Sequence, residues 1–283
     1  MTTIWARGVR SDEERIQILA SAPTFPGLQI LGLLSHGDDV DVFDVWCSVR
    51  RTRCVLKAVR AECKTDRGVM ARFQRESELL LRLAHPHIVR AYEVGDAPVP
   101  YLLEETLTGN TLSNLLGRRG LKRADLLHLT DHLTAALAYL HDQGILHLDL
   151  KPSNIVVEGG RTKLIDFNLA RSPGVGPADW GTPRYFAPEQ EAGGMFTTAT
   201  DIWGLGVVLQ EAARRRVPRA FQQLIHRSLS IDPRDRPSIA EFRSYLAIAL
   251  EQPHFDSVTH TPDGVTPCND RQYAEAGSGH QIR

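Results

Sequence analysis

One short segment and the aspartate that follows it set the tightest limits on how this chain can fold. Residues 147–154 read HLDLKPSN, and Asp166 lies further on in IDFNLAR. Between them, residues 155–157 and 163–165 have the pattern of two short strands separated by a Glu-Gly-Gly turn. Such a hairpin would return Asp166 to the side of Asn154. We therefore expect a fold in which polar side chains distant in sequence meet at one site.

The polar residues of this predicted site have the chemistry needed to move a phosphoryl group from ATP to a hydroxyl. The reaction needs a carboxylate to orient the hydroxyl, a cation near the developing charge and oxygen ligands for magnesium. Asp149 and Lys151 can meet the first two needs. Asn154 and Asp166 can supply the metal ligands.

Composition is compatible with a sizeable folded domain and disfavours several classes of partner. The 283 residues are 42% hydrophobic, which is enough for a substantial core. The net charge of -1 gives no general attraction to nucleic acid, and no apolar run approaches the ~20 residues that span a bilayer. The sequence shows no signal-peptide pattern and no C-x-x-C pair. We therefore expect a cytoplasmic protein with reduced thiols, no nucleic-acid partner and no membrane span.

Changes in hydrophobic periodicity divide the chain into four stretches. Residues 1–27 form an N-terminal extension with one short helix. Residues 28–107 have the pattern of a small β-sheet with one helix, and residues 108–250 are mostly helical. In residues 251–283 the periodicity stops and polar residues, Pro and Gly prevail, so we expect a disordered tail.

The same periodicity predicts approximate positions for the elements. Strands are expected at residues 28–34, 40–46 and 53–59. Helices are expected at residues 12–20, 72–83, 112–116, 123–143, 200–214, 221–229 and 239–250. The order of these elements separates a β-rich part from a helical part.

Further motifs precede and follow HLDLKPSN in a defined order. Lys57 ends the apolar run VLK, and Glu76 lies in the helical pattern RFQRESELLLRLAHPHIV. Downstream come GTPRYFAPEQ, then Asp201 in TDIWGLG and Arg236 in DPRDRPS. In this order the motifs resemble the catalytic domain of eukaryotic-type serine/threonine protein kinases, in their bacterial Hanks-type branch, over residues 28–250.

The resemblance implies a fold and a reaction. The fold would be α+β and bilobal, with a small antiparallel β-sheet and one main helix in the N-lobe and a mostly helical C-lobe. The N-lobe would comprise residues 28–107 and the C-lobe residues 108–250. The reaction would transfer the ATP γ-phosphoryl group to a serine or threonine hydroxyl of a protein substrate, with magnesium, or manganese in its place, as the metal.

The resemblance also implies roles for the residues of the catalytic segment. Asp149 would be the catalytic base, and Lys151 would lie near the transferred phosphate. Asn154 and Asp166 would bind the metal. The residues from Asp166 to the end of GTPRYFAPEQ would form the activation segment.

For the nucleotide pocket, the resemblance implies a second set of residues. Lys57 would grip the α and β phosphates, held by Glu76 or, failing that, by Glu78. The rest of the pocket would be formed by Ser35, Gly37, Val42, Val55, Val156 and the backbone of Glu105 and Leu107.

The glycine-rich loop of the family, G-x-G-x-x-G, is largely replaced here. Aligned from Lys57, the loop reads LSHGDDVDV, in which only Gly37 remains. Val40 is bulky, and Asp38 and Asp39 would add negative charge near a polyphosphate. We expect weak ATP binding or a strong need for a divalent metal to screen that charge.

Three substitutions lie nearer to the chemistry. Leu148 replaces the arginine that pairs with a phosphorylated activation loop, and Ser172 is the only hydroxyl in residues 170–180, so we expect no switching by loop phosphorylation. Asn168 replaces a glycine, and we interpret it as tolerated because asparagine accepts left-handed backbone. Glu104 replaces an apolar residue behind the adenine. It must find a donor or face solvent, or its pKa will rise.

Several polar residues are expected to be structural. Arg236 would pair with Glu189 inside the C-lobe. His128 and His132 have helical spacing that could chelate zinc, but no third ligand is apparent, so we interpret them as a helix face. The basic run at residues 214–216 is interpreted as solvated surface.

Three functions remain open at this point. The first is an active serine/threonine protein kinase, for which a partner protein or the terminal extensions supply substrate recognition. The second is a pseudokinase that binds nucleotide weakly and acts as a regulatory scaffold, which the altered glycine loop favours. The third is a small-molecule phosphotransferase with a similar H-x-D-x-x-x-x-N loop. GTPRYFAPE and Lys151 argue against the third, because they belong to the machinery that places a protein hydroxyl.

Overall fold

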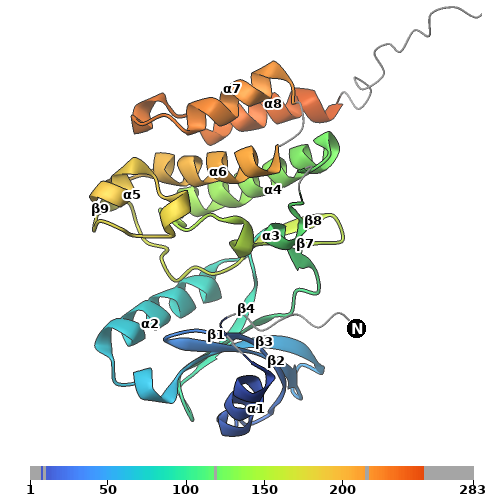
Figure 1. Cartoon of the computed structure of the whole chain (residues 1–283), viewed down its shortest axis with the longest axis vertical. Coiled ribbons are helices and arrows are strands. Elements are labelled where there is room, and N and C mark those ends of the chain that lie inside the picture. Colours follow the sequence, from blue (N-terminus) through green and yellow to red (C-terminus); the bar gives the residue numbers. More distant parts are fainter. Residues whose placement is uncertain (1–7, 9–10, 118–119, 214–216, 252–283) are drawn as a thin grey trace, which may run out of the picture.

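The chain folds into two lobes joined near the middle of the molecule (Figure 1). The structure is a computed structural model that describes residues 8, 11–117, 120–213 and 217–251. One lobe contains a five-stranded antiparallel sheet, and the other is built mainly from helices. The expected α+β bilobal fold is confirmed.

The N-lobe sheet has the strand order β1-β2-β3-β5-β4. Its strands are β1 (Leu28–His36), β2 (Val40–Cys47), β3 (Thr52–Val59), β4 (Ala91–Gly95) and β5 (Tyr101–Glu105). The first three match the predicted strands, whereas β4 and β5 were not predicted. The main helix, α2 (Arg67–Arg82), begins before the expected residue 72. The side chain of Asp66 accepts hydrogen bonds from Gly68 and Val69 N–H groups and so caps the helix there.

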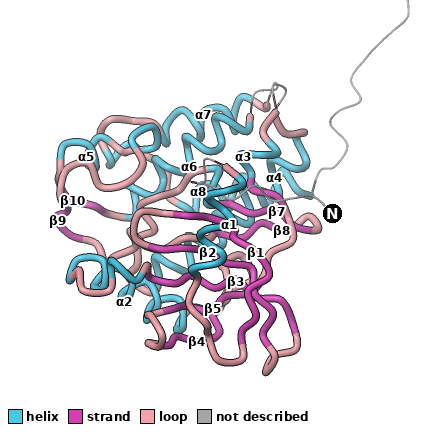
Figure 2. The backbone as a smooth tube through the Cα atoms, turned by 60° about the horizontal axis from the view of Figure 1, so that its bottom comes forward, coloured by secondary structure: helices cyan, strands magenta, loops and turns pink. Residues whose placement is uncertain are grey.

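The two faces of this sheet have different partners. Side chains alternate along each strand, so Phe43 and Leu56 point to the outer face and Lys57 points to the inner face. On the outer face, α1 (Asp12–Ser21) packs Ile18 and Leu19 against the buried strand residues. The helix α2 packs on the inner face, where Phe73 and Leu80 share a buried cluster with Leu102 of β5, and Figure 2 shows it beside β4 and β5. The inner face is therefore the one available to a site between the lobes.

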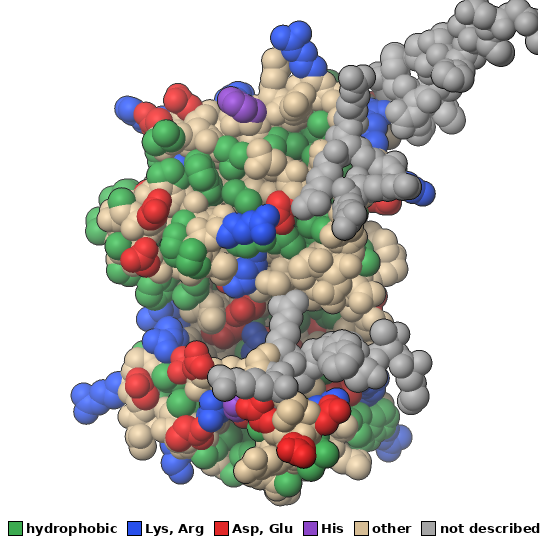
Figure 3. Space-filling model, in the orientation of Figure 1, with side chains coloured by type: hydrophobic (Ala, Val, Ile, Leu, Met, Phe, Trp, Pro, Cys, Tyr) green, Lys and Arg blue, Asp and Glu red, His purple; other side chains and the backbone are tan. Residues whose placement is uncertain are grey.

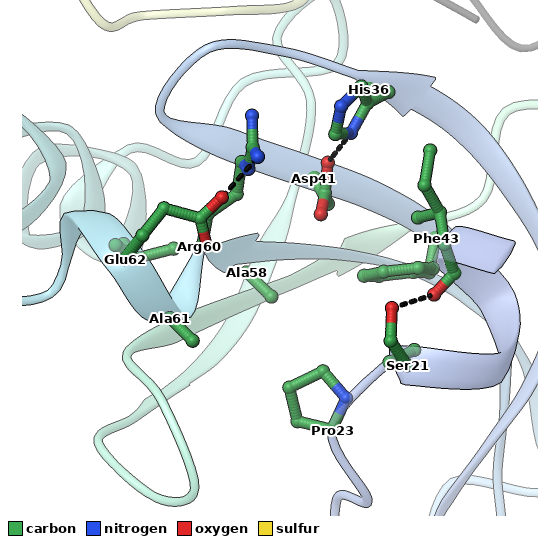
Figure 4. A pocket seen from close by; sticks show the side chains of 12 residues that line it. Ser21, Pro23, His36, Asp41, Phe43, Ala58, Arg60, Ala61 and Glu62 are labelled. Carbon is green, nitrogen blue, oxygen red and sulfur yellow. Dashed lines mark hydrogen bonds and ion pairs between the residues drawn. The ribbon is translucent and has the colours of Figure 1, made fainter. Parts of the chain in front are cut away.

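A small cavity of about 150 Å³ lies between the end of α1 and the outer face of the sheet (Figure 4). At its rim, His36 Nδ1 lies 2.6 Å from Asp41 Oδ1, and Arg60 forms an ion pair with Glu62. The cavity is on the opposite side of the sheet from Lys57. It is therefore separate from the residues that the catalytic motifs bring together.

The C-lobe consists of helices and two small sheets. Its helices are α3 (Leu112–Leu115), α4 (Arg123–Asp142), α5 (Pro188–Ala192), α6 (Thr198–Ala212), α7 (Arg219–Ser228) and α8 (Ile239–Glu251). One sheet contains β6 (Asn110–Thr111), β7 (Ile155–Glu158) and β8 (Arg161–Leu164); the other pairs β9 (Gly174–Gly176) with β10 (Gly194–Phe196). The antiparallel pair β7 and β8 is the hairpin that the sequence predicts after HLDLKPSN.

One buried core crosses from the N-lobe into the C-lobe. It contains Leu80 of α2, Phe167 after β8, Leu137 of α4 and Leu205 of α6. The helical positions follow the predicted periodicity, and each predicted C-lobe helix is present within a few residues. Burial of this continuous apolar surface fixes α2 relative to the catalytic segment.

Some expectations concern residues outside the described ranges. The basic run at residues 214–216 and the tail at residues 252–283, with Cys268, are among them. Within the described ranges, no helix is long and apolar enough to cross a membrane.

Candidate active site

A buried carboxylate of α6 holds the backbone that precedes Asp149. Asp201 is 1% exposed, and its two oxygens accept hydrogen bonds from the N–H groups of His147 and Leu148 at 3.0 and 2.8 Å. It also lies 2.9 Å from His141 Nε2. Leu148 has a left-handed φ of 64°, an uncommon conformation for a leucine, which these contacts maintain. The catalytic segment is thus fixed by a residue far along the chain.

Three polar side chains meet at the carboxylate of Asp149. Lys151 Nζ lies 2.6 Å from Asp149 Oδ2, and Thr182 Oγ1 donates to Asp149 Oδ1 at 2.7 Å. Lys151 Nζ also donates to Thr182 Oγ1 at 2.7 Å, and Asn154 Nδ2 donates to Asp149 Oδ2 at 2.9 Å. The site can therefore hold a hydroxyl between a carboxylate and an ammonium group. This is the geometry that a general base requires.

Asn154 and Asp166 are brought to the same place by the β7–β8 hairpin. The N–H of Ile165, the residue before Asp166, donates to the carbonyl oxygen of Asn154 at 2.9 Å. The amide nitrogen of Asn154 donates to Asp149. Its amide oxygen accepts a long hydrogen bond of 3.5 Å from Ser153 Oγ and has a second lone pair for a cation. Two such oxygen donors fit Mg²⁺, because this ion keeps several waters and binds substrate phosphates. In the part of the chain that the structure describes, no group of three or more His, Cys, Asp or Glu side chains is arranged to hold a metal.

The helix α2 places Glu76 against Lys57 of β3. Lys57 Nζ lies 2.7 Å from Glu76 Oε1, and both side chains are largely buried. The same Oε1 accepts a hydrogen bond from the N–H of Phe167 at 3.2 Å. Glu76 therefore connects the sheet to the segment that carries Asp166. Glu78, the alternative partner, is exposed and does not pair with Lys57.

Glu104 was expected to find a donor, to face solvent or to have a raised pKa, and the structure shows the first and the third. It is 3% exposed, and its Oε1 lies 3.4 Å from Lys57 Nζ, so it has found a cation. Burial nevertheless raises the pKa of Glu104 to about 7, because the attraction of Lys57 only partly opposes it and Glu76 adds to the rise. Lys57 therefore has two carboxylate neighbours.

The turn between β1 and β2 carries the two aspartates that were expected to add negative charge near a polyphosphate, and one of them is paired. Gly37 is needed for the turn, because a Cβ there would lie 2.8 Å from the carbonyl oxygen of Val40. Arg72 of α2 lies 2.7 Å from Asp39 Oδ2, so the charge of Asp39 is paired. Asp38 is exposed, and its charge remains at the turn that was expected to lie near the phosphates.

The residues expected around adenine lie on the inner side of the sheet and below it. In β2 and β3, Val42 is paired with Lys57, and Val55 with Asp44, which places both valines on the inner face. Val156 is buried in β7. Figure 3 shows the molecule narrowing between the lobes, with acidic and basic side chains at this waist. The adenine contacts themselves stay predictions.

The remaining pocket residues are located as follows. Ser35 is paired with Val42 across β1 and β2. The carboxylate of Glu105 forms an ion pair with Lys163, and Leu107 packs against the main core. The side chain of Glu105 thus binds Lys163, whereas the expected contact with adenine concerns the backbone of Glu105.

Apolar contacts and hydrogen bonds hold the activation segment against the catalytic segment. Leu148 is 4% exposed and packs with Phe196 and Trp180. The amide of Gln190 donates to the carbonyl oxygens of Leu148 and Trp180 at 2.9 and 2.6 Å. The leucine that replaces an arginine therefore belongs to a small core. The prediction that Asn168 is accepted because asparagine tolerates left-handed backbone is wrong. The left-handed φ, of 66°, belongs to Asp166 and not to Asn168.

Of the structural roles expected in the C-lobe, the role of Arg236 is confirmed and that of His132 differs from the expectation. Both oxygens of Glu189 accept from the guanidinium of Arg236, at 2.7 and 2.8 Å. The ring of His132 stacks on His87 at 4.1 Å between centroids, and burial lowers the pKa of His132 to about 4. His132 is therefore packed between elements and is more than a helix-face residue.

Sequence reasoning missed the contact of Thr182 with Asp149. The motif GTPRYFAPEQ placed Thr182 in the activation segment without giving it a partner. Only the folded backbone brings it to Asp149 and Lys151. The available signal was a hydroxyl residue directly after Gly181 in that motif.

Comparison with known proteins agrees with this geometry. Residues 28–220 match the family model described as the protein kinase domain. The serine/threonine-protein kinase PkaA of Streptomyces coelicolor is 36% identical over 197 residues, which cover 65% of this chain and 36% of that protein. Pkn3 of Myxococcus xanthus is 31% identical over 253 residues, or 72% and 46% of the two chains. PrkC of Bacillus subtilis is 30% identical over 198 residues, or 67% and 31%.

The matched region thus spans less than half of each of these relatives, while it covers most of this chain. The family match includes β1 through α6, and so contains every residue of the catalytic segment. The chain therefore belongs to the protein kinase domain family.

Proposed function

We propose that this protein is a serine/threonine protein kinase that transfers the γ-phosphoryl group of ATP to a protein hydroxyl. The observation that carries the proposal is the cluster of Asp149, Lys151 and Thr182, in which a hydroxyl already lies 2.7 Å from both charged groups. The relatives named above support serine or threonine as the residue that accepts the phosphoryl group, since each is called a serine/threonine-protein kinase.

In the proposed mechanism, Asp149 orients the substrate hydroxyl and takes its proton as the new bond to phosphorus forms. Lys151 stabilises the negative charge that develops on the transferred group. Thr182 connects these two side chains and keeps the carboxylate in one orientation. The roles fit in-line transfer, which depends mainly on positioning and charge stabilisation.

The N-lobe would position the nucleotide. Lys57, held by Glu76, contacts the α and β phosphates, and adenine lies between Val42 and Val55 on one side and Val156 on the other. Members of this family use ATP together with a divalent metal. Asn154 and Asp166 would hold that metal, which we propose to be magnesium, and it would supply positive charge to offset the phosphates.

The metal assignment has its own test. Asp166→Asn should reduce metal-dependent transfer by about 10²-fold or more, because it removes a charged ligand near the phosphates. The melting temperature should stay within about 2 °C, since Asp166 is only partly buried. Full activity in this variant would show that the metal assignment is wrong.

We also propose that the activation segment needs no phosphorylation. Leu148, Trp180 and Phe196 supply apolar contacts in the place where a phosphate would meet an arginine. Recognition of the protein substrate is assigned to a partner protein or to the terminal extensions, because the segment between Asp201 and Arg236 is shorter than the usual spacing in this family.

The test is transfer of labelled γ-phosphate, with magnesium or manganese, to the protein itself and to a generic basic protein. Asp149→Asn is measured in parallel. Label on serine or threonine that disappears in the variant supports the proposal. Transfer equal to that of the variant, from folded protein in either metal, would favour the scaffold function.

A further inference from the structure

One buried carboxylate at the nucleotide site has no place in the mechanism above. Glu104 of β5 is paired with Val55 of β3, and Leu102, two residues earlier, is paired with Lys57. Paired residues have side chains on the same face, and side chains alternate along a strand. Glu104, Leu102 and Lys57 therefore share the inner face of the sheet. Glu104 is fixed at the back of the nucleotide pocket.

Lys57 lies between two carboxylates that are bound differently. Its Nζ is 2.7 Å from Glu76 Oε1 and 3.4 Å from Glu104 Oε1. Glu76 has a second donor in the N–H of Phe167. Glu104 Oε1, by contrast, accepts no hydrogen bond from any residue that the structure describes. The ammonium group of Lys57 is therefore what offsets the buried charge of Glu104.

Negative charge exceeds positive charge in this part of the site. Burial lowers the pKa of Lys57, but the charges of Glu104, Glu76 and Asp166 outweigh burial and raise that pKa. Three carboxylates thus act on one ammonium group. A polyphosphate that enters here meets a lysine whose charge is already compensated.

We infer that Glu104 is a positioning residue that competes with the nucleotide phosphates for Lys57. Its charge draws the ammonium group toward the back of the pocket, so the phosphates gain less from Lys57. Nucleotide binding then depends more on a divalent cation, which offsets the additional carboxylate. The inference rests on the proposed function in one respect, namely that Lys57 contacts the phosphates of a nucleotide.

The test compares the wild type with Glu104→Gln, which removes the charge and keeps the shape of the side chain. Calorimetric titration with ATP is repeated over a series of magnesium concentrations at about pH 8.5, where Glu104, with a pKa of about 7, carries its charge. The dissociation constant for ATP should fall about three- to tenfold in the variant, and its dependence on magnesium should become shallower. In the transfer assay, KM for ATP should fall by the same factor while kcat changes less than about twofold.

A matched control removes a carboxylate from the same lobe outside the site. Glu78→Gln on α2 alters an exposed side chain two residues beyond Glu76. It should leave the ATP affinity and its magnesium dependence unchanged. Glu104→Leu, of similar size and without hydrogen-bonding groups, repeats the test if the glutamine variant does not fold.

The inference is overturned if removal of the charge leaves the ATP affinity unchanged or weakens it. Weaker binding would show that Glu104 helps to present Lys57 to the phosphates. A changed melting temperature with unaltered affinity would show a purely structural role. Titration does not need the catalytic base, so failure of phosphoryl transfer alone leaves this test intact. Absence of ATP binding in both wild type and variant would contradict the inference and the proposed function together.

Discussion

In the C-lobe, the polar side chains that contact Asp149 keep the protein kinase pattern, whereas in the N-lobe the charged side chains around Lys57 depart from it. Asp149 is in contact with Lys151, Asn154 and Thr182. Lys57 keeps Glu76 but gains Glu104 as a second carboxylate. The groups proposed for phosphoryl transfer are thus retained, whereas the charges around the lysine proposed to bind the nucleotide differ.

The reason lies in what each region must do. The catalytic segment needs a fixed geometry, and Asp201 fixes it through two backbone N–H groups. The proposed nucleotide site only needs enough affinity for ATP. Its charges can therefore vary, because a divalent metal can offset additional negative charge. The two regions should therefore respond differently to mutation.

The largest effect is expected in the C-lobe. Asp149→Asn should lower the rate of phosphoryl transfer by about 10²–10⁴-fold, because it removes the proposed general base. ATP affinity by calorimetry should change less than twofold, since the proposed phosphate contact of Lys57 lies in the N-lobe. Asp142→Asn, an exposed change at the end of α4, serves as the control. A large loss of ATP affinity in Asp149→Asn would break the proposed separation of the two regions.

A second effect concerns the activation segment. Leu148→Ala should lower the free energy of unfolding by about 2–4 kcal/mol, because it leaves a cavity beside Phe196 and Trp180. Proteolysis within residues 172–179 should become faster than in the wild type. Phosphatase treatment of the wild type should leave the transfer rate unchanged. A loss of activity after that treatment would show that this region is controlled by phosphate after all.

A smaller effect is expected in the N-lobe, where Glu104 should make the free energy of unfolding depend on pH. The pKa of Glu104 is raised from 4.5 to about 7 in the folded protein. The folded state therefore binds a proton more tightly than the unfolded state, and stability falls as pH rises through this range. Between pH 5.5 and 7.5, the wild type should lose about 1–2 kcal/mol more unfolding free energy than Glu104→Gln. Chemical denaturation at the two pH values measures this difference, and parallel curves would contradict the burial of a titrating Glu104.

The smallest effect is expected at the β1–β2 turn. Asp39→Asn should change ATP affinity by less than about twofold, because Arg72 already pairs with Asp39 at a half-exposed position. Its magnesium dependence should match that of the wild type. If Asp39→Asn altered the magnesium dependence more than Glu104→Gln did, the surplus charge would belong to the turn and not to the back of the pocket.

The sequence was most informative where the chemistry is local. Asp149, Lys151 and Asn154 lie within one short segment, and the pattern of β7 and β8 predicted the return of Asp166. Hydrophobic periodicity likewise predicted the C-lobe helices, because their buried faces repeat along the chain. These features could be predicted since sequence spacing determines them.

Contacts between distant segments could not be predicted in this way. Arg72 and Asp39, like Thr182 and Asp149, meet only because the backbone folds them together. The strands β4 and β5 are short and carry few β-branched residues, so their pattern was weak. Glu104 was recognised as unusual, but whether it faced solvent or Lys57 depended on the register of β5 against β3.

The most direct test of the central claim is phosphoryl transfer measured together with ATP binding on the same preparation of the full chain in magnesium. The account predicts that label transfer to serine or threonine rises with ATP and saturates as the binding site fills. It also predicts that Asp149→Asn binds ATP with the same affinity and transfers almost none. Filled binding sites with wild-type transfer no greater than that of Asp149→Asn would contradict the account.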